Sequence, residues 1–277
     1  MTKTLIVSGD SYTVPGQHPS TPKSWASYLA EKRKWVMQNY AKGGGSNAHI
    51  FNSTIDAIEH RHTDNIVVIT CWSCPTRLNV FDAFCQIVES EEMLLKQVAA
   101  GDQNSFNYVE TTSEFTKLLN ELVGKSWHDG SLSEMFKKIV NNSLRYMYLL
   151  EEYCQMKNIE YYSWSSLNPF GDYCALKSFV EAYPIEEDEQ IVFKKAVKEI
   201  QQENDYYYYL KKSNSYMGFN FTCWDYVHQA GCTVSSKDHH PNDEGHKILA
   251  KVIDKFIDDG IKLNITDKYS RPVYIYD

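Results

Sequence analysis

Two short polar segments near opposite ends of the chain hold the residues whose types and spacing could do chemistry. Gly9-Asp10-Ser11 follows the apolar run at residues 5–7, and Asp238-His239-His240-Pro241 precedes a segment with helical periodicity. A serine becomes a nucleophile when a base lies within hydrogen-bond reach, and a carboxylate then fixes the tautomer of that base. The second segment supplies a histidine with an aspartate two residues upstream. Together the segments predict nucleophilic catalysis by a serine, a histidine and an aspartate.

Each segment also has a non-catalytic interpretation. Gly9-Asp10-Ser11 is compatible with a polar turn whose side chains satisfy backbone donors. Asn242 or Asp243 could cap the helix that follows, with the histidines merely exposed. The catalytic interpretation requires that the two segments meet in space.

The elements that must position these segments alternate between strands and helices. Short apolar, β-branched or aromatic runs predict strands near residues 5–8, 36–40, 65–71 and 159–164. Helical periodicity predicts helices at 25–34, 47–61 and 245–259, a helical stretch within 80–157, and another at 176–212. Such alternation favours an α/β fold with a parallel sheet and helices on both faces. Ligands bind at the carboxyl ends of such strands, which is where Ser11 is expected.

At this point the sequence resembles the SGNH (GDSL-type) hydrolase family, through its Gly9-Asp10-Ser11 block and its late Asp238-x-His240 block. The resemblance implies a three-layer α/β/α flavodoxin-like sandwich with Ser11 as nucleophile, His240 as general base and Asp238 as the orienting carboxylate. The commonest family spacing would place Lys237 at the acid position. Because lysine cannot orient an imidazole in this way, Asp238 is assigned.

The resemblance also implies an oxyanion hole, a set of donors for the charge that develops on the attacked carbonyl oxygen. The glycine-rich block at residues 39–47 matches the family, and Gly44 supplies a backbone N–H beside that of Ser11, with Gly45 as the near alternative. The usual Gly-x-Asn-Asp block is replaced, so that Ser73 stands where the family has asparagine. Either Ser73 or Asn47 substitutes, or the hole lacks a donor typically worth ~3 kcal/mol in the transition state.

The segment from Trp72 to Arg77, with Trp25, resembles SGNH-type proteins encoded by tailed bacteriophages. We expect Trp72 and Arg77 to contact substrate, Arg77 through an anionic or sugar group. Cys71 and Cys74 lack a second cysteine pair or a spaced histidine pair, so no metal is expected. The glycine-rich block lacks the spacing of a phosphate loop, and no cofactor is expected.

Composition bounds the partners of the chain. Its 277 residues carry 28 Lys+Arg against 36 Asp+Glu, a formal net charge of −8, which disfavours a nucleic acid or an anionic membrane as partner. No apolar stretch is long enough for a membrane span or a secretory signal, so we expect a cytoplasmic protein, in the host cytoplasm if phage-encoded. The chain has 20 tyrosines, and the run Tyr206–Tyr209 predicts a carbohydrate platform or an interface for a homo-oligomer or virion partner.

We therefore expect one domain over residues 1–277, with a helical insertion at about 80–220 and a tail at 260–277. The expected function is a serine esterase acting on a small-molecule or carbohydrate ester, as in a carbohydrate O-deacetylase. Two alternatives share the fold: a binding or virion-associated protein with a decayed site, and an acyltransferase with the same triad.

Overall fold

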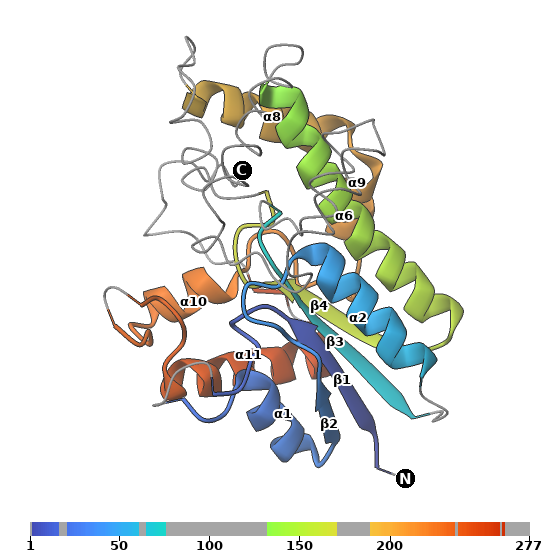
Figure 1. The fold of residues 1–277 in the computed structure, drawn as a ribbon, viewed down its shortest axis with the longest axis vertical. Helices are drawn as coiled ribbons and strands as arrows, with labels where there is room; N and C mark the ends of the chain where they lie inside the picture. Colours follow the sequence, from blue (N-terminus) through green and yellow to red (C-terminus); the bar gives the residue numbers. More distant parts are fainter. Residues whose placement is uncertain are drawn as a thin grey trace, which may run out of the picture.

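The computed structural model describes residues 2–16, 21–60, 65–75, 132–170, 189–235, 238–260 and 262–263. Within these residues, four parallel strands form one sheet in the order β2-β1-β3-β4 (Figure 1). The strands are β1 (Thr4–Gly9), β2 (Val36–Asn39), β3 (Ile66–Trp72) and β4 (Glu160–Ser165). The helices are α1 (Trp25–Arg33), α2 (Asn47–Glu59), α6 (Leu132–Met156), α8 (Glu189–Glu203), α9 (Asp205–Lys212), α10 (Cys223–Gln229) and α11 (Asp243–Asp259). This strand order is that of the first four strands of flavodoxin-like folds.

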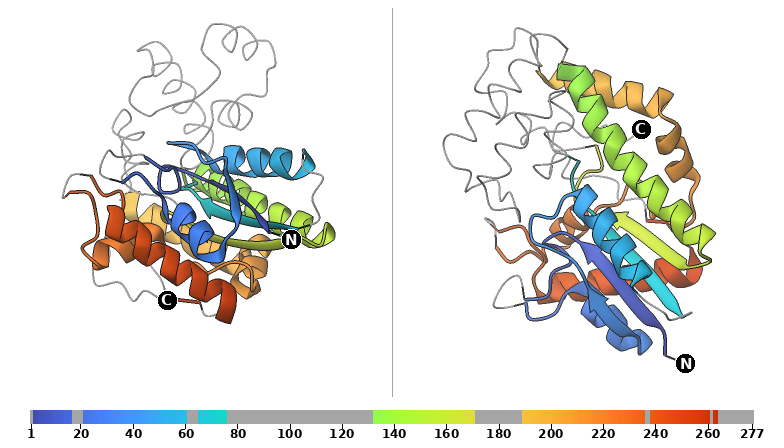
Figure 2. Two further views of the ribbon diagram at one scale, coloured as in Figure 1. Left: turned by 90° about the horizontal axis from the view of Figure 1, so that it is seen from below. Right: turned by 45° about the vertical axis from the view of Figure 1, so that its right-hand side comes forward.

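The alternation of side chains along the strands divides the core into two layers. Ile6 and Val68 face one side, where they pack with residues of α2, α6, α8 and α9. Leu5, Val7 and Ile69 face the other side, where they pack with residues of α1, α10 and α11. Both faces of a parallel sheet must be covered because both carry apolar side chains. Figure 2 shows the sheet between α2 and α6 on one side and α1 and α11 on the other. The predicted α/β/α sandwich is confirmed.

The helices begin where the sequence supplies caps. The Ser46 hydroxyl accepts a hydrogen bond from the backbone N–H of His49 at the start of α2, at 3.2 Å. The Asn242 side chain accepts one from Gly245 at the start of α11, at 2.9 Å. Such caps satisfy N–H groups that have no partner within the helix. The first turns of α2 and α11 lie next to two of the predicted blocks, so the caps also fix where those blocks sit.

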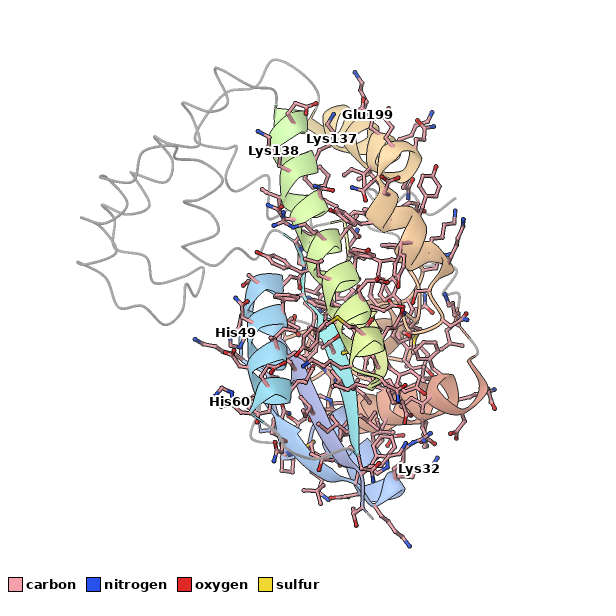
Figure 3. The ribbon with its side chains drawn as sticks, turned by 90° about the vertical axis from the view of Figure 1, so that its right-hand side faces the viewer. Lys32, His49, His60, Lys137, Lys138 and Glu199 are labelled. Atoms are coloured by element: carbon pink, nitrogen blue, oxygen red, sulfur yellow. The ribbon has the colours of Figure 1, made fainter. Side chains whose placement is uncertain are left out.

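The helical stretch predicted at 176–212 is divided in the described part. Asn204 ends the run of α8 and caps α9, accepting a hydrogen bond from Tyr207 N–H at 2.8 Å. An asparagine side chain can bond to a nearby backbone N–H and so end one helix and begin another. A prediction from apolar periodicity alone does not detect such a break. α8 is joined to α6 by an ion pair between Glu199 and Lys137 at 2.8 Å, and Figure 3 shows both residues at one end of α6.

The tyrosine run at the start of α9 is split between core and surface. Tyr207 is buried against Phe170 and Phe219, whereas Tyr208 is exposed. Tyr206 and Tyr209 both pack against Tyr148 of α6. Four consecutive helical residues cannot share one face. Much of the run therefore joins α9 to α6, and its predicted role as a platform or interface stays a prediction.

The predicted insertion at 80–220 contains elements of the sandwich itself. β4 pairs with β3 in parallel register, and α6 packs against α2 on one face of the sheet. α6 is thus a crossover helix between β3 and β4, as parallel strands require. Residues 76–131 and all but two residues of the predicted tail after Gly260 lie outside the described residues. Within the described part, no helix is both long and apolar enough to cross a membrane.

Candidate active site

Ser11 lies in a tight turn directly after β1, an inner strand of the sheet that ends at Gly9. Its side chain is largely buried, and the Thr13 N–H closes the turn on the Asp10 carbonyl at 2.9 Å. A Cβ at Gly9 would lie 2.4 Å from the Thr13 hydroxyl and 3.1 Å from the Cys71 Cβ. Because only glycine leaves room for the turn to fold back on β3, the first residue of the block is a packing requirement.

The structure brings the two distant segments into contact. The Ser11 Oγ lies 2.9 Å from His240 Nε2, and His240 Nδ1 lies 2.7 Å from Asp238 Oδ1. Asp238 Oδ1 also accepts the backbone N–H of His240, at 3.1 Å. The serine is 229 residues from the histidine in sequence. A hydroxyl, an imidazole and a carboxylate in this series have the order and spacing that nucleophilic catalysis needs.

The loop that carries His240 is held at both ends. Before it, the Ser235 hydroxyl accepts the Asp238 N–H at 2.9 Å, and the Val234 N–H donates to the His240 carbonyl at 2.9 Å. After it, the Asn242 N–H donates to the Cys232 carbonyl, also at 2.9 Å. Asn242 also caps α11. The segment therefore caps a helix, as the non-catalytic interpretation expects, and also brings His240 to Ser11. The histidine side chain is 33% exposed and can be reached by solvent.

Tyr12 joins the serine turn to the histidine loop. Its ring lies 5.2 Å from the His240 ring between centroids, and its hydroxyl donates to the His239 carbonyl at 3.3 Å. His239 packs in turn against Trp224 of α10, with ring centroids 4.5 Å apart. Neither Tyr12 nor α10 was predicted to take part in the site, because an isolated aromatic residue carries no local signal for the contacts it makes. The sequence feature that could have pointed to Tyr12 is its position directly after Ser11.

Two backbone N–H groups predicted for the oxyanion hole have no hydrogen-bond partner among the described residues, those of Ser11 and Gly44. Gly45 differs, because its N–H donates to the Lys42 carbonyl at 2.9 Å. Gly44 has a φ of 70°, in the left-handed region that favours glycine. Of the two glycines, Gly44 is thus the one whose N–H is available within the described part, and its role in the hole stays a prediction.

The two side chains predicted to replace the missing asparagine of the hole are engaged elsewhere. The Ser73 hydroxyl donates to the Asp10 carboxylate at 3.1 Å. The Asn47 amide donates to the Ser73 carbonyl at 2.9 Å and to the Ser143 hydroxyl, while its oxygen accepts the Ser73 N–H at 2.7 Å. Asn47 therefore fastens the start of α2 to the segment after β3. Both side chains thus bond to residues that surround the site. An oxyanion role for either one stays a prediction.

Trp72, predicted to contact substrate, is fully buried in the core layer that contains Ile6 and Val68. The structure gives it a packing role there, since a side chain without exposed surface has none to offer a ligand. Arg77, the other predicted contact, lies outside the described residues.

Burial shifts the pKa values of two groups near the site. Burial lowers the pKa of His246, on α11, to about 4, and its Nδ1 accepts the backbone N–H of Trp25 at 3.2 Å. Burial also raises the pKa of the Cys71 thiol, whose Sγ lies 3.8 Å from that of Cys223. A neutral thiol is a poor nucleophile and metal ligand. The described residues contain no group of three or more His, Cys, Asp or Glu side chains placed to hold a metal ion.

No model of a known protein family matches the chain, and no curated protein is similar to it in sequence. Among solved structures, it is similar to the lipase Lip_vut3 from a goat rumen metagenome, with 12% identity, 91% of this chain and 96% of that chain covered, and a TM-score of 0.43. It is also similar to a member of the lipolytic protein G-D-S-L family from Veillonella parvula DSM 2008, with 12% identity, coverage of 90% and 94%, and a TM-score of 0.35. The fold class given above rests on the strand order and the two helical layers of this chain.

Proposed function

We propose that the protein is a serine esterase of the SGNH (GDSL) type. The observation that carries the proposal is the hydrogen-bonded series from the Ser11 hydroxyl through the His240 imidazole to the Asp238 carboxylate, at 2.9 and 2.7 Å. The series stands at the carboxyl end of the parallel sheet, where ligands of such sheets bind.

In the proposed reaction the Ser11 Oγ attacks the carbonyl carbon of an ester while His240 Nε2 takes the hydroxyl proton. Asp238 holds the imidazole in the required tautomer and stabilises the imidazolium. The backbone N–H groups of Ser11 and Gly44 are the donors proposed for the oxyanion of the tetrahedral intermediate. When the intermediate collapses, His240 gives its proton to the departing alcohol. Water then repeats the sequence on the acyl-serine, which releases the acid and restores Ser11.

The proposed substrate is an acetyl ester on a carbohydrate. Supporting it are the partly exposed rings beside the histidine loop, where Trp224 packs against both His239 and His228. Aromatic faces combined with polar ring nitrogens suit a sugar, which presents apolar faces and hydroxyl groups together. A transfer of the acyl group to an alcohol instead of water would use the same residues.

The test compares hydrolysis of p-nitrophenyl acetate and of an acetylated xylan by the wild type, Ser11→Ala and Ser27→Ala. Ser27 lies on α1 and serves as the matched control, because its replacement removes the same hydroxyl away from the site. We expect Ser11→Ala to lose at least about 10³-fold in kcat, and Ser27→Ala to keep the wild-type rate. A wild type without activity would support the binding-protein alternative. Acetylated product formed from added glycerol would support the acyltransferase.

A further inference from the structure

The proposed mechanism leaves one fully buried carboxylate beside the nucleophile without a role. Asp10 precedes Ser11 and is fully buried. Its Oδ1 accepts the backbone N–H of Tyr12 at 3.1 Å. Its Oδ2 accepts hydroxyl groups from Ser73, at 3.1 Å, and from Ser166, at 2.7 Å. A buried carboxylate is stable only when hydrogen bonds replace its lost hydration, so these donors decide where Asp10 can sit.

Ser166 supplies the shorter of the two hydroxyl bonds. Its Oγ is also 3.1 Å from the Trp72 carbonyl, but a serine hydroxyl has one proton to donate. If that proton pointed at Trp72, the Ser166 and Asp10 oxygens would face each other at 2.7 Å without a proton between them. The charged acceptor at the shorter distance therefore takes the bond.

The backbone of Ser166, directly after β4, hydrogen-bonds to two further elements, β3 and α10. Its N–H donates to the Trp72 carbonyl at the end of β3, at 2.7 Å, and its carbonyl accepts the Trp224 N–H at the start of α10, at 3.0 Å. Ser166 itself directly follows β4 and is fully buried. The hydroxyl is thus held by a rigid junction of β3, β4 and α10, and it extends that junction to the turn after β1.

Asp10 connects this junction to the two residues that react, Ser11 and His240. Its carboxylate and its carbonyl hold the Tyr12 and Thr13 N–H groups, which fixes the turn that contains Ser11. Tyr12 then packs on the His240 ring. A shift of the carboxylate would change the approach of the Ser11 Oγ to His240 Nε2, and attack by a nucleophile is sensitive to such displacements.

We propose that Ser166 is a positioning residue for the nucleophile, acting through the Asp10 carboxylate. The inference rests on the proposed function, since it concerns the rate of the proposed reaction at Ser11. Ser166 does not touch the reacting atoms. Loss of its hydroxyl lowers kcat and leaves KM nearly unchanged, because the fully buried Ser166 offers no surface to the substrate.

The experiment measures kcat and KM for p-nitrophenyl acetate in Ser166→Ala and in the control Ser165→Ala. Ser165 is the neighbouring residue, equally buried, and its hydroxyl pairs with Tyr216 at 2.9 Å instead of Asp10. For Ser166→Ala we expect kcat to fall by about 10- to 100-fold with KM within about twofold, as for loss of a bond to a charged group. Ser165→Ala should keep kcat within about threefold of the wild type. If Ser166→Ala does not fold, Ser166→Cys fills the site with a slightly larger side chain of the same shape while weakening the donor, and kcat is again expected to fall.

A double-mutant cycle shows whether Ser166 acts through Asp10. In an Asp10→Asn background, Ser166→Ala should cost less than about threefold in kcat, because the charged acceptor is already gone. Equal kcat values for Ser166→Ala and Ser165→Ala, or additive losses in the cycle, would overturn the inference while the esterase assignment stands. A wild type that does not hydrolyse the ester would overturn both.

Discussion

Replacement of His246 by asparagine tests how a buried neutral histidine supports the start of α11, directly after the His240 loop. His246 is 3% exposed, and its Nδ1 accepts the Trp25 N–H at the first turn of α1. Burial, which is the largest cause, lowers its pKa to about 4 from the ordinary 6.5; the charge of Asp243 opposes this shift and that of His240 adds to it. An asparagine oxygen can take the position of Nδ1 and accept the same bond without titrating.

The sign of the pH effect follows from the lowered pKa. Between pH 6.5 and about 4 the unfolded chain binds a proton at this histidine that the folded chain does not, so stability falls as pH falls through that window. Above pH 6.5 both states are neutral and the contribution is complete. With these two pKa values, the free energy of unfolding falls by about 2 kcal/mol between about pH 7.5 and pH 5, and by about 3 kcal/mol at still lower pH.

Urea unfolding followed by tryptophan fluorescence at both pH values measures this difference. We expect the wild type to lose about 2 kcal/mol more than His246→Asn between the two pH values. His60→Asn is the control, because His60 is exposed at the end of α2, as Figure 3 shows. It should behave as the wild type does. Equal pH dependence in the wild type and His246→Asn would show that protonation of His246 is not what lowers stability in this pH range.

Three further predictions concern the site and the packing around it. Asp238→Asn should lower kcat by about 10²- to 10⁴-fold in the p-nitrophenyl acetate assay, because the amide disfavours the required tautomer of the base; an unchanged rate would exclude Asp238 as its partner. Gly245→Ala should destabilise the fold by about 2 kcal/mol or more in urea unfolding, since the new Cβ would lie 2.4 Å from the Cys232 carbonyl oxygen; wild-type stability would contradict the packing described. Arg33→Met should cost about 2–3 kcal/mol, because Arg33 Nε pairs with the 8% exposed Asp254 side chain at 2.5 Å; a loss below about 0.5 kcal/mol would place the pair among weak surface pairs.

The sheet could be predicted from the sequence because its strands are recognisable from local residue types. Ile66–Trp72 is an almost continuous apolar run with polar residues before it, and the predicted strand at 65–71 differs from β3 by one residue at each end. α10 was missed. Its seven residues, Cys223–Gln229, are too few to show helical periodicity, and Thr222 caps it by accepting a local hydrogen bond from the Asp225 N–H. Short helices depend on such caps and on tertiary packing more than on pattern.

The site divides in the same way. The sequence indicated that Ser11, His240 and Asp238 could meet, because their blocks have recognisable residue types and order; their catalytic roles stay a prediction. The bond from Ser166 to Asp10 could not be predicted, since it spans 156 residues and no neighbour in sequence marks it. Ser73 was assigned a role from its place in a block, whereas its hydroxyl in the structure donates to Asp10. Contacts between distant residues depend on strand register, which the sequence pattern does not specify.

In the proposed mechanism His240 activates Ser11, and labelling with a fluorophosphonate followed by peptide mass spectrometry measures this activation. We expect one stable adduct on Ser11 in the wild type. We also expect labelling slower by about 10³-fold or more in His240→Ala, since the general base is then absent. An adduct on a different serine, no adduct at all, or equal labelling rates in the wild type and His240→Ala would contradict this mechanism.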